Sequence, residues 1–464
     1  MSKGISKITA REAALKVLSS HRQKKAWSEL ALNSVIKSAN LSTLDTRLTV
    51  QLVYGALQNM TLCDYYASKY STMPLKKLEP RVLDILRLSI YQILFLDKIP
   101  HNAAANEGVA LTKKFSNQRA AGFVNAVLRK ISKGKNEKTL PEITGDDLDI
   151  LSIKYSHPKW LAAKISKRFG PEQTKLFFKA NNLDNIPITI QINTLLTNEK
   201  QVYDMLLEEG INVFKHDFLP DALEFRGGGN FIFTKAFTDG YYYVQDTAAK
   251  LSVIAAEPKP GDCVIDGCSA PGGKSFAAAI LMKNEGQIFS CDIHPAKLRH
   301  IKEGSKRLGI SIISAIEMDA SKDVASQIVR ATDTYSREYN IISEGADVVI
   351  ADVPCSGFGI IRKKPEIRYK SYEDVKDLPK IQKGILNQLS KYVKPGGTLL
   401  YSTCTILKEE NEDVVDSFLS ENPEFSLQGF TLPGIGEVGE GRITLLPQIN
   451  GTDGFFICKM KRTG

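Results

Sequence analysis

Two cysteine-containing segments near the end of the chain have the residue types that covalent catalysis requires. Residues 352–357 are Asp-Val-Pro-Cys-Ser-Gly, and residues 401–405 are Tyr-Ser-Thr-Cys-Thr. Each follows a short apolar run typical of a buried strand, so both are predicted at the carboxyl edge of a parallel sheet. A lone cysteine there is usually a small buried apolar residue. A pair of them, one after Asp-x-Pro, instead indicates a nucleophile with an acidic partner.

A thiolate can prepare a pyrimidine ring for methylation at carbon 5. That carbon is a poor nucleophile until a sulfur adds to carbon 6 and makes carbon 5 enamine-like. A carboxylic acid such as Asp352 can supply a proton or hydrogen bond to ring nitrogen 3 during the attack. A base must then remove the carbon-5 proton so that the sulfur can leave. Cys404, Cys355 and Asp352 are therefore the candidate catalytic residues.

A glycine-rich turn is predicted to bind a cofactor at the same edge of the sheet. Residues 266–275 are Asp-Gly-Cys-Ser-Ala-Pro-Gly-Gly-Lys-Ser and lie between a predicted strand and a predicted helix. Glycines let the backbone approach a ligand, and the helix that follows presents free amides to an anionic group. The candidate cofactor-binding residues of this turn are Cys268, Ser269, Ala270, Pro271, Gly272, Gly273 and Lys274.

The same residues are compatible with two different kinds of turn. The segment could be a simple tight turn. A dinucleotide-binding turn does not fit, because the segment lacks Gly-x-Gly-x-x-Gly. It differs from the phosphate-binding pattern Gly-x-x-x-x-Gly-Lys-Ser at Cys268, and Pro271 would remove one donor amide. A nucleotide hydrolase is therefore a second hypothesis, with residues 348–352 as its magnesium-binding strand.

Two further acidic residues follow successive predicted strands. Asp292 lies at about the distance downstream at which an acid binds a ribose hydroxyl. Asp319 follows the apolar run at 312–318 and is placed to contact an adenine. Either carboxylate could instead cap a helix. Their succession favours a nucleoside-containing cofactor such as S-adenosyl-L-methionine.

The elements that must position these residues fall into three parts. Residues 6–135 have helical apolar spacing interrupted by prolines at 74, 80 and 100, and residues 133–145 have linker composition. Helices and strands are mixed from 148 to 245. From Pro258 onward, strands alternate with helices, which predicts a parallel sheet covered on both faces. The predicted domains are 1–140, 146–245 and 246–464.

Individual elements are predicted inside the last two parts. The helices of the small part are 159–169, 172–180 and 199–209, and its strands are 186–192 and 241–244. In the last part the strands are 263–265, 288–291, 348–351 and 398–401, the helices include 295–308 and 372–392, and a hairpin at 443–448 and 454–461 closes one edge of the sheet.

Charge is unevenly distributed along the chain. Residues 1–140 contain 23 lysines and arginines against 9 acidic residues, whereas the remainder contains 38 basic and 43 acidic residues. A phosphate backbone is a common partner for such a basic region, although solvated lysines on helices explain it equally well. No apolar run is long enough to cross a membrane, and the polar residues 1–10 contain no signal segment, so a cytoplasmic location is expected. The seven cysteines and six histidines form no disulfide framework or zinc pattern.

Taken together, the segments 266–275, 352–357 and 401–405 with Asp292 resemble the Fmu/Sun family of RNA 5-methylcytosine methyltransferases. The Tyr-Ser-Thr-Cys element distinguishes that family from DNA cytosine methylases, which have only the Pro-Cys type of cysteine. Other segments that match its pattern are 363–368 (Lys-Lys-Pro-Glu-Ile-Arg), 445–448 (Leu-Leu-Pro-Gln) and 451–456 (Gly-Thr-Asp-Gly-Phe-Phe).

The resemblance extends upstream over nearly the whole chain. Residues 106–111 and 122–129 resemble the NusB-type helical RNA-binding domain, which is fused to this methyltransferase in the bacterial RsmB branch. The segments that resemble the small RNA-guiding module of the family are 157–160 (His-Pro-Lys-Trp), 191–194 (Gln-Ile-Asn-Thr) and 244–246 (Val-Gln-Asp). Three residues depart from the pattern: Gln191 stands where arginine is usual, and Ser269 and Gly108 where alanine is usual.

The resemblance implies a multidomain fold with an all-α NusB-like N-terminal domain, a small α+β module and a C-terminal α/β Rossmann-like class I methyltransferase domain. It implies an S-adenosyl-L-methionine-dependent enzyme that forms 5-methylcytosine in small-subunit (16S) ribosomal RNA. Cys404 would be the nucleophile, Cys355 would assist release of the product, and Asp352 would contact the base and the cofactor. Residues 268–274, Asp292 and Asp319 would bind the cofactor, with no metal.

The expected partner is small-subunit ribosomal RNA, with no membrane, and the chain is expected to act as a monomer. A third hypothesis is a non-catalytic RNA-binding or antitermination factor, with a degenerate enzyme behind the helical domain. The intact set of Cys404, Cys355 and Asp352 argues against it.

Overall fold

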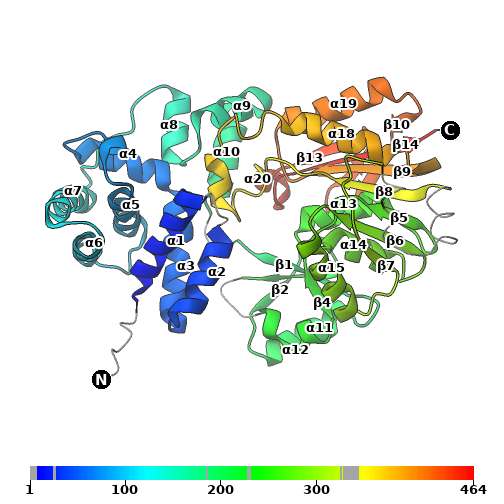
Figure 1. Cartoon of the computed structure of the whole chain (residues 1–464), viewed down its shortest axis with the longest axis horizontal. Helices are drawn as coiled ribbons and strands as arrows, with labels where there is room; N and C mark the ends of the chain where they lie inside the picture. Colours follow the sequence, from blue (N-terminus) through cyan, green and yellow to red (C-terminus); the bar gives the residue numbers. More distant parts are fainter. Residues whose placement is uncertain are drawn as a thin grey trace. The chain divides into compact units, whose positions relative to one another are not determined.

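A computed structural model of the chain describes residues 8–463 except 25–27, 184–185, 227–230, 324–326 and 328–343. The chain divides into two compact units (Figure 1). The helical unit comprises Met1–Asn182 and Lys364–Lys370, and the sheet unit comprises Leu183–Lys363 and Ser371–Gly464. Residues 146–182 therefore group with the helical unit, so this division does not follow the predicted boundary at residue 146.

The N-terminal part of the helical unit is all-α, as predicted. Pro80 is the first residue of one helix, and Pro74 and Pro100 immediately precede two others, because proline has a helical φ but no amide to donate. The predicted linker at 133–145 begins inside α7. The helices are α1 (Ala10–Lys24), α2 (Ser28–Ala39), α3 (Thr43–Gln58), α4 (Met60–Tyr70), η1 (Leu75–Lys77), α5 (Pro80–Phe95), α6 (His101–Phe115), α7 (Gln118–Asn136), α8 (Asp147–Lys154), α9 (Lys159–Phe169) and α10 (Pro171–Asn181).

Helix α5 lies at the centre of this bundle and is buried on nearly all sides, including residues Ile85, Leu86 and Ser89. The departure at Gly108 of α6 is explained by its contact with α5. A Cβ added at Gly108 would lie 2.4 Å from the Ser89 hydroxyl oxygen and 2.9 Å from a methyl carbon of Leu128. The Ser89 side chain thus fills the space that an alanine at position 108 would need.

A short segment from the C-terminal part of the sequence completes the helical unit. Residues 364–370 contain the turn η3 (Pro365–Tyr369), and the Arg368 side chain is fully buried. Its Nη1 donates to the carbonyl oxygens of Gln58 at 2.8 Å and Tyr155 at 3.2 Å, at the ends of α3 and α8, and to Asn182 Oδ1 at 2.9 Å, beyond α10. A guanidinium satisfies these helix C-termini because their carbonyls are unpaired and carry partial negative charge.

The sheet unit is built on an eight-stranded sheet with the order β10-β14-β9-β8-β5-β6-β7, in which β13 also pairs with β14. The five strands from β9 to β7 are parallel, and β14 runs antiparallel to β9. Their bounds are β5 (Cys263–Asp266), β6 (Gln287–Asp292), β7 (Ile313–Glu317), β8 (Ala346–Asp352), β9 (Val393–Thr403), β10 (Phe425–Leu427), β13 (Arg442–Leu445) and β14 (Phe455–Arg462).

Helices cover both faces of this sheet, which confirms the doubly covered α/β prediction (Figure 1). Alternate strand residues enter two cores: Val264 and Ile350 pack against α13 (Thr247–Ala256), α14 (Gly273–Leu281) and α15 (Pro295–Arg307). Ile265 and Ala351 pack against α18 (Leu378–Ser390) and α19 (Glu412–Glu421). The predicted helix 372–392 is shorter, because it begins only after Asp377 with a proline in its first turn.

The predicted C-terminal hairpin is interrupted. β13 and β14 pair antiparallel, but the helical turn α20 (Pro447–Asn450) lies between them, and it includes the predicted strand residue Gln448. The remaining elements of the sheet unit near this region are η4 (Lys408–Glu410) and the two-stranded pair β11 (Phe430–Leu432) and β12 (Gly436–Val438).

A second, antiparallel sheet belongs to the same unit and has the order β2-β3-β1-β4. Its strands are β1 (Ile188–Ile192), β2 (Val213–Lys215), β3 (Ala222–Phe225) and β4 (Tyr242–Val244), with α11 (Glu199–Glu208), η2 (Phe231–Phe233) and α12 (Lys235–Thr238) beside them. Gln191 is 1% exposed, and its Nε2 donates to the Gln245 carbonyl at 3.3 Å. The departure at this position therefore gives a buried hydrogen bond between β1 and the chain after β4. No helix in the described residues is long and apolar enough to cross a membrane.

We predict that Arg368→Met lowers the free energy of unfolding by about 3 kcal/mol, because several buried helix-end carbonyls lose a charged donor. Burial lowers the pKa of Arg368 only to about 10, so the side chain is charged at neutral pH. Urea unfolding of the full chain, followed by far-UV circular dichroism, measures the loss. The control is Arg299→Met, since Arg299 is exposed on α15 and, among the described residues, forms an ion pair only with Glu303, at 3.1 Å. Equal midpoints for the two variants would contradict the prediction.

Candidate active site

The two predicted cysteines meet at the carboxyl edge of the sheet. Strands β8 and β9 are parallel neighbours with Asp352 opposite Ser402, so the segments that follow them leave the sheet side by side. The Sγ atoms of Cys355 and Cys404 are 3.3 Å apart, and both residues are partly exposed. The structure therefore brings both candidate thiols to one point.

The backbone holds the loop after Cys355 against Cys404. The Gly359 amide donates to the Cys404 carbonyl at 2.9 Å, and the Gly454 amide donates to the Gly359 carbonyl at 2.9 Å. A Cβ at Gly359 would lie 1.8 Å from the Gly454 carbonyl oxygen and 2.8 Å from that of Cys404. Only glycine permits this approach of three backbone segments.

A partly buried ion pair lies near the thiols. Lys274, at the start of α14, places its Nζ 2.6 Å from Asp352 Oδ2, and the Ser402 hydroxyl donates to Asp352 Oδ1 at 2.8 Å. Burial lowers the pKa of Lys274, but the Asp352 carboxylate, with smaller contributions from Asp266 and Cys404, outweighs it, so the net shift is upward. Lys274 is thus a positive charge that Asp352 holds at the carboxyl edge of the sheet.

The environment of Cys355 disfavours its thiolate form. The pKa of its thiol is raised well above the usual range, first by the hydrogen bond with Cys404, then by burial and by the charges of Cys404, Glu410 and Asp352. The structure therefore supplies several groups that keep the proton on Cys355.

The glycine-rich turn lies between β5 and α14. Ser269 is anchored by its amide and its hydroxyl, which both donate to the Cys291 carbonyl, at 2.7 and 2.9 Å. The departure at this position therefore adds a hydrogen bond that alanine could not make. Gly272 has φ +111°, and a Cβ there would lie 2.6 Å from the Phe276 ring. The turn thus requires glycine for its conformation as well as for ligand approach.

Asp266, which ends β5 directly before this turn, has an unsatisfied oxygen. The Ser275 hydroxyl is 2.6 Å from Oδ2, whereas Oδ1 is fully buried and has no hydrogen-bond partner in the part of the chain that the structure describes. Burial raises the pKa of this carboxyl to about 7. A buried acceptor without a donor is costly, and the ammonium group of an amino-acid ligand would satisfy it. The site therefore fits a ligand with an amino-acid end.

Asp292 and Asp319 follow β6 and β7 as predicted, but they differ in their surroundings. Asp292 is 7% exposed, and its Oδ1 accepts from the His294 amide at 2.9 Å. The carboxylate of Asp319 accepts from the hydroxyl of Ser321 at 2.6 Å and pairs with Lys322 at 3.0 Å. Neither residue is the N-cap of α15, which is His294. Asp292 is thus placed at the carboxyl edge of the sheet, and Asp319 is engaged locally.

Sequence reasoning assigned no role to two groups of polar side chains, although it noted the segments that contain Asp246, Lys363 and Asp453 as matching the family pattern. The first is Glu410 in η4, which is 1% exposed. The second is a cluster in which Lys363 lies 2.5 Å from Asp246 and 2.8 Å from Asp453, while Arg362 lies 2.5 Å from Asp453. Glu410 belongs to an acidic run, which is ordinarily a solvated helix start, so its sequence does not indicate burial. For the second group, the only available signal was the presence of opposite charges in distant segments.

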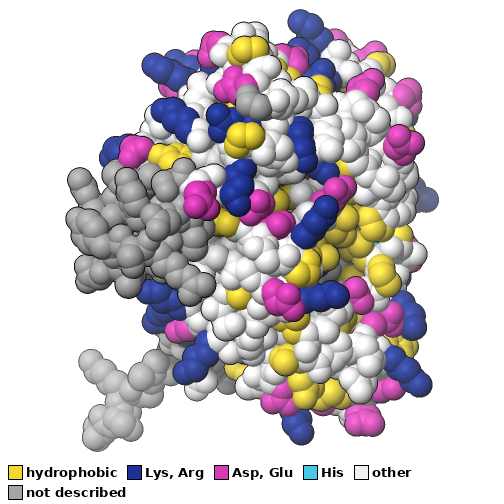
Figure 2. Space-filling model, turned by 90° about the vertical axis from the view of Figure 1, so that its right-hand side faces the viewer, with side chains coloured by type: hydrophobic (Ala, Val, Ile, Leu, Met, Phe, Trp, Pro, Cys, Tyr) yellow, Lys and Arg dark blue, Asp and Glu magenta, His cyan; other side chains and the backbone are white. Residues whose placement is uncertain are grey.

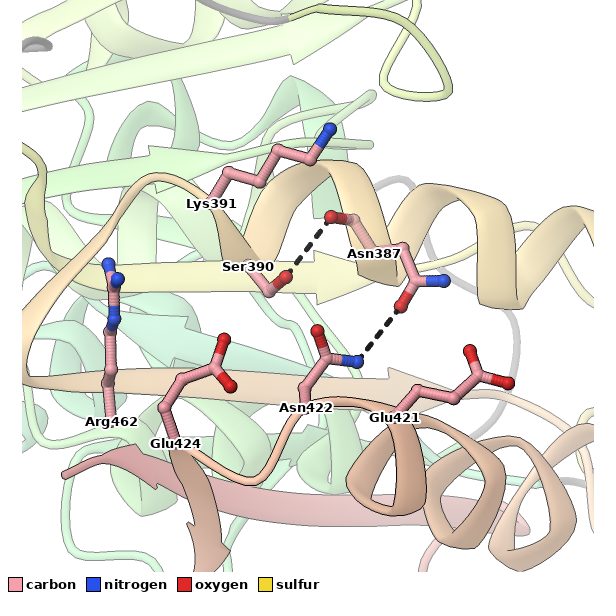
Figure 3. A pocket seen from close by; sticks show the side chains of 7 residues that line it. All are labelled: Asn387, Ser390, Lys391, Glu421, Asn422, Glu424 and Arg462. Carbon is pink, nitrogen blue, oxygen red and sulfur yellow. Dashed lines mark hydrogen bonds between the residues drawn. The ribbon is translucent and has the colours of Figure 1, made fainter. Parts of the chain in front are cut away.

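A cavity elsewhere in the sheet unit is separate from these groups. It lies near the start of β9, the opposite end of the strand from Cys404, and is lined by polar side chains (Figure 3). The lining residues are Asn387, Ser390, Lys391, Glu421, Asn422, Glu424 and Arg462. Arg462 donates to the Val393 carbonyl at 2.6 Å, which ties this rim to the strand.

Comparison with known proteins matches three stretches of the sequence to three family models. Residues 8–133 match the NusB family, residues 157–231 match the ferredoxin-like domain of RsmF/B-like methyltransferases, and residues 253–461 match the 16S rRNA methyltransferase RsmB/F family. The probable ribosomal RNA small subunit methyltransferase B of Bacillus subtilis (strain 168) is 38% identical over 99% of this chain and 100% of its own length. The chain belongs to the ribosomal RNA small subunit methyltransferase B family.

Other members and solved structures agree with this assignment. The probable ribosomal RNA small subunit methyltransferase B of Synechocystis sp. is 29% identical over 98% of this chain and 100% of its own length. The crystal structure of PH0851 is 29% identical, has a TM-score of 0.78 and covers 97% of this chain and 98% of its own. Membership of this methyltransferase family argues against the nucleotide-hydrolase hypothesis.

For this family member we predict a pH-dependent stability that depends on Asp266. Its pKa is about 7 in the folded chain and near 3.8 when unfolded, so the folded state keeps a proton that the unfolded state has lost between these values. The contribution is fully present below about pH 4 and is lost as the pH rises to about 7, a change on the order of 4 kcal/mol.

Asp266→Asn should therefore flatten the fall in stability between pH 4 and 7, as measured by urea unfolding without added ligand. Asp319→Asn is the control, because hydrogen bonding by Ser321 lowers the pKa of Asp319 and so moves its titration below that range. A slope in Asp266→Asn equal to that of the parent chain would contradict the assignment.

Proposed function

We propose that this chain transfers a methyl group from S-adenosyl-L-methionine to carbon 5 of a cytosine in small-subunit (16S) ribosomal RNA, through a covalent bond between Cys404 and carbon 6. The observation that carries the proposal is the pair of thiols 3.3 Å apart beside the ion pair of Lys274 and Asp352. A purely structural cysteine pair would not need a partly buried lysine and carboxylate near it.

The cofactor would be held by the glycine-rich turn and the acids around it. Residues 268–274, Asp292 and Asp319 are the proposed binding residues, together with Asp266, whose free Oδ1 suits an ammonium group. When bound, S-adenosyl-L-methionine supplies an electrophilic methyl group. Because Asp319 already binds Ser321 and Lys322, its contact with the adenine end is the least supported of the set.

In the proposed chemistry Cys404 acts as the nucleophile and Cys355 as the base that removes the carbon-5 proton. Cys404 attacks carbon 6 as a thiolate beside Lys274, while Asp352 supplies a hydrogen bond or proton to ring nitrogen 3. The proton retained by Cys355 leaves to solvent after methyl transfer. Cys355 then takes the carbon-5 proton, the electron pair of that C–H bond forms the C5–C6 double bond, and the pair of the C–S bond returns to Cys404. The cycle releases one proton, as methylation of a C–H position requires.

The basic helical region is the proposed RNA-binding part. Residues 1–140 have an excess of basic side chains, whereas on the face shown in Figure 2 basic and acidic side chains are interspersed. We therefore assign phosphate contacts to residues 1–140 on the ground of their basic excess, and the small sheet module would guide the strand. The target cytosine must leave its stack to reach Cys404, because the thiol attacks above the ring plane.

We predict that Cys404→Ala abolishes methyl transfer to ribosomal RNA, since no other described thiol is paired with Cys355. Transfer of a tritiated methyl group to 16S RNA measures this, and Cys458→Ala is the control because Cys458 is a buried core residue of β14. Retained transfer in Cys404→Ala would refute the proposed mechanism.

Cys355→Ala should instead leave a covalent enzyme–RNA adduct that migrates slowly on a denaturing gel, because the bond forms but is not resolved. The adduct should disappear in the double variant with Cys404→Ala. An adduct found with Cys404→Ala alone would reverse the two roles.

A further inference from the structure

Glu410 is a buried carboxylate that the mechanism above does not use. It ends η4, six residues after Cys404, and is 1% exposed. Its Oε2 accepts from the Ser356 amide and from Gln382 Nε2, both at 2.8 Å, and its Oε1 accepts from the Thr405 hydroxyl at 3.3 Å. Among the described residues its side chain has no ion-pair partner, so three neutral donors hold it.

The partners of Glu410 are the residues that follow the two cysteines. Ser356 comes directly after Cys355, and Thr405 directly after Cys404. Their hydroxyl oxygens are 2.7 Å apart, so the two loops are joined to each other as well as to the carboxylate. One side chain is thus fastened to both cysteine-bearing loops.

Gln382 of α18 extends the same network to the residue before Cys355. Its Nε2 donates to the Pro354 carbonyl at 3.0 Å in addition to Glu410. The Tyr401 hydroxyl donates to the Glu410 carbonyl at 2.6 Å, which fixes the backbone of η4 against β9. The carboxylate is therefore held on a rigid support, as a side chain that sets the position of others must be.

We propose that Glu410 is a positioning residue that fixes the spacing of Cys355 and Cys404, so that the adduct formed by Cys404 can be resolved by Cys355. This inference rests on the proposed function. The two sulfurs must act on adjacent carbons of one ring, and a displacement of about 1 Å at a reacting group can cost about 100-fold in rate. The charge of Glu410 also acts on Cys355 and favours its protonated form. The other groups that face Cys355 are Cys404, Asp352 and Tyr401.

The first test measures thiol spacing without catalysis. Phenylarsine oxide bonds two neighbouring thiols at once, so its affinity for the full chain, with the Cys404→Ala value as background, reports the spacing. We expect Glu410→Ala to weaken this affinity at least tenfold. Glu410→Gln should retain most of it, because the amide can still accept from the Ser356 amide.

The second test separates adduct formation from adduct resolution in single turnovers with 16S RNA. We expect Glu410→Ala to accumulate the slow-migrating adduct, with resolution slowed about 100-fold and formation slowed less. Gln382→Met, which removes the donor to both Glu410 and Pro354, should slow resolution of the adduct about tenfold. It keeps the inference testable if Glu410→Ala does not fold.

The matched control is Asp347→Asn. Asp347 is a carboxylate of the same sheet at the opposite edge, where it accepts from the Cys263 amide at 2.9 Å and binds Lys394 at 2.9 Å. Its loss should cost stability without changing arsenical affinity or the ratio of adduct to product.

Unchanged arsenical affinity and adduct lifetime in folded Glu410→Ala or Gln382→Met would overturn the inference. If Cys355→Ala accumulates the adduct while these variants behave as the parent chain, the inference alone fails. If no variant forms an adduct and Cys404→Ala still methylates RNA, the proposed function fails and the inference falls with it.

Discussion

Parallel pairing of β8 with β9 is the constraint from which the site is built. With Asp352 opposite Ser402, the two chains leave the sheet at one level, and a few residues suffice to bring Cys355 and Cys404 together. Adjacent loops would diverge if nothing joined them. Here the backbone contacts of Gly359 with Cys404 and Gly454 hold them, at a distance that excludes any side chain. The pairing gives proximity, and the glycines give precision.

Electrostatic interactions then act on the groups at this edge. Asp352 keeps Lys274 charged, and the hydrogen bond with Cys404, burial and the charges of Glu410 and Asp352 raise the pKa of the Cys355 thiol. A second cluster balances two positive against two negative charges: Arg362 and Lys363 in the loop that follows Cys355 pair with Asp246 and Asp453. Removing one member of such a cluster leaves an uncompensated buried charge, which is costly. The loop is therefore fixed in place by charges that attract one another across distant parts of the sequence.

Much of the fold and part of the candidate site were predictable from local patterns, because strand ends, glycine turns and helix boundaries are encoded by adjacent residues. The α/β fold with helices on both faces was confirmed, and Pro80 and Pro100 mark helix starts as predicted. The roles of Cys355, Cys404 and Asp352 stay predictions. What could not be predicted depends on long-range contacts: Glu410 reaches Ser356 across 54 residues, and Arg368 reaches Gln58 across 310. No periodicity reports such pairs, since they exist only once the chain has folded.

The segment that contains Arg368 belongs to one part of the molecule by sequence family and to another by its contacts. Residues 364–370 lie inside the stretch that matches the RsmB/F methyltransferase family, yet they belong to the helical unit by their contacts. Arg368 satisfies carbonyls at the ends of α3 and α8, and the Tyr369 hydroxyl donates to the Leu57 carbonyl at 2.8 Å. A fragment that ended at residue 182 would leave these buried acceptors without donors. The part that matches the NusB family and the part that matches the methyltransferase family are thus separate in sequence family but not in folding, because the helical unit includes residues 364–370 of the second.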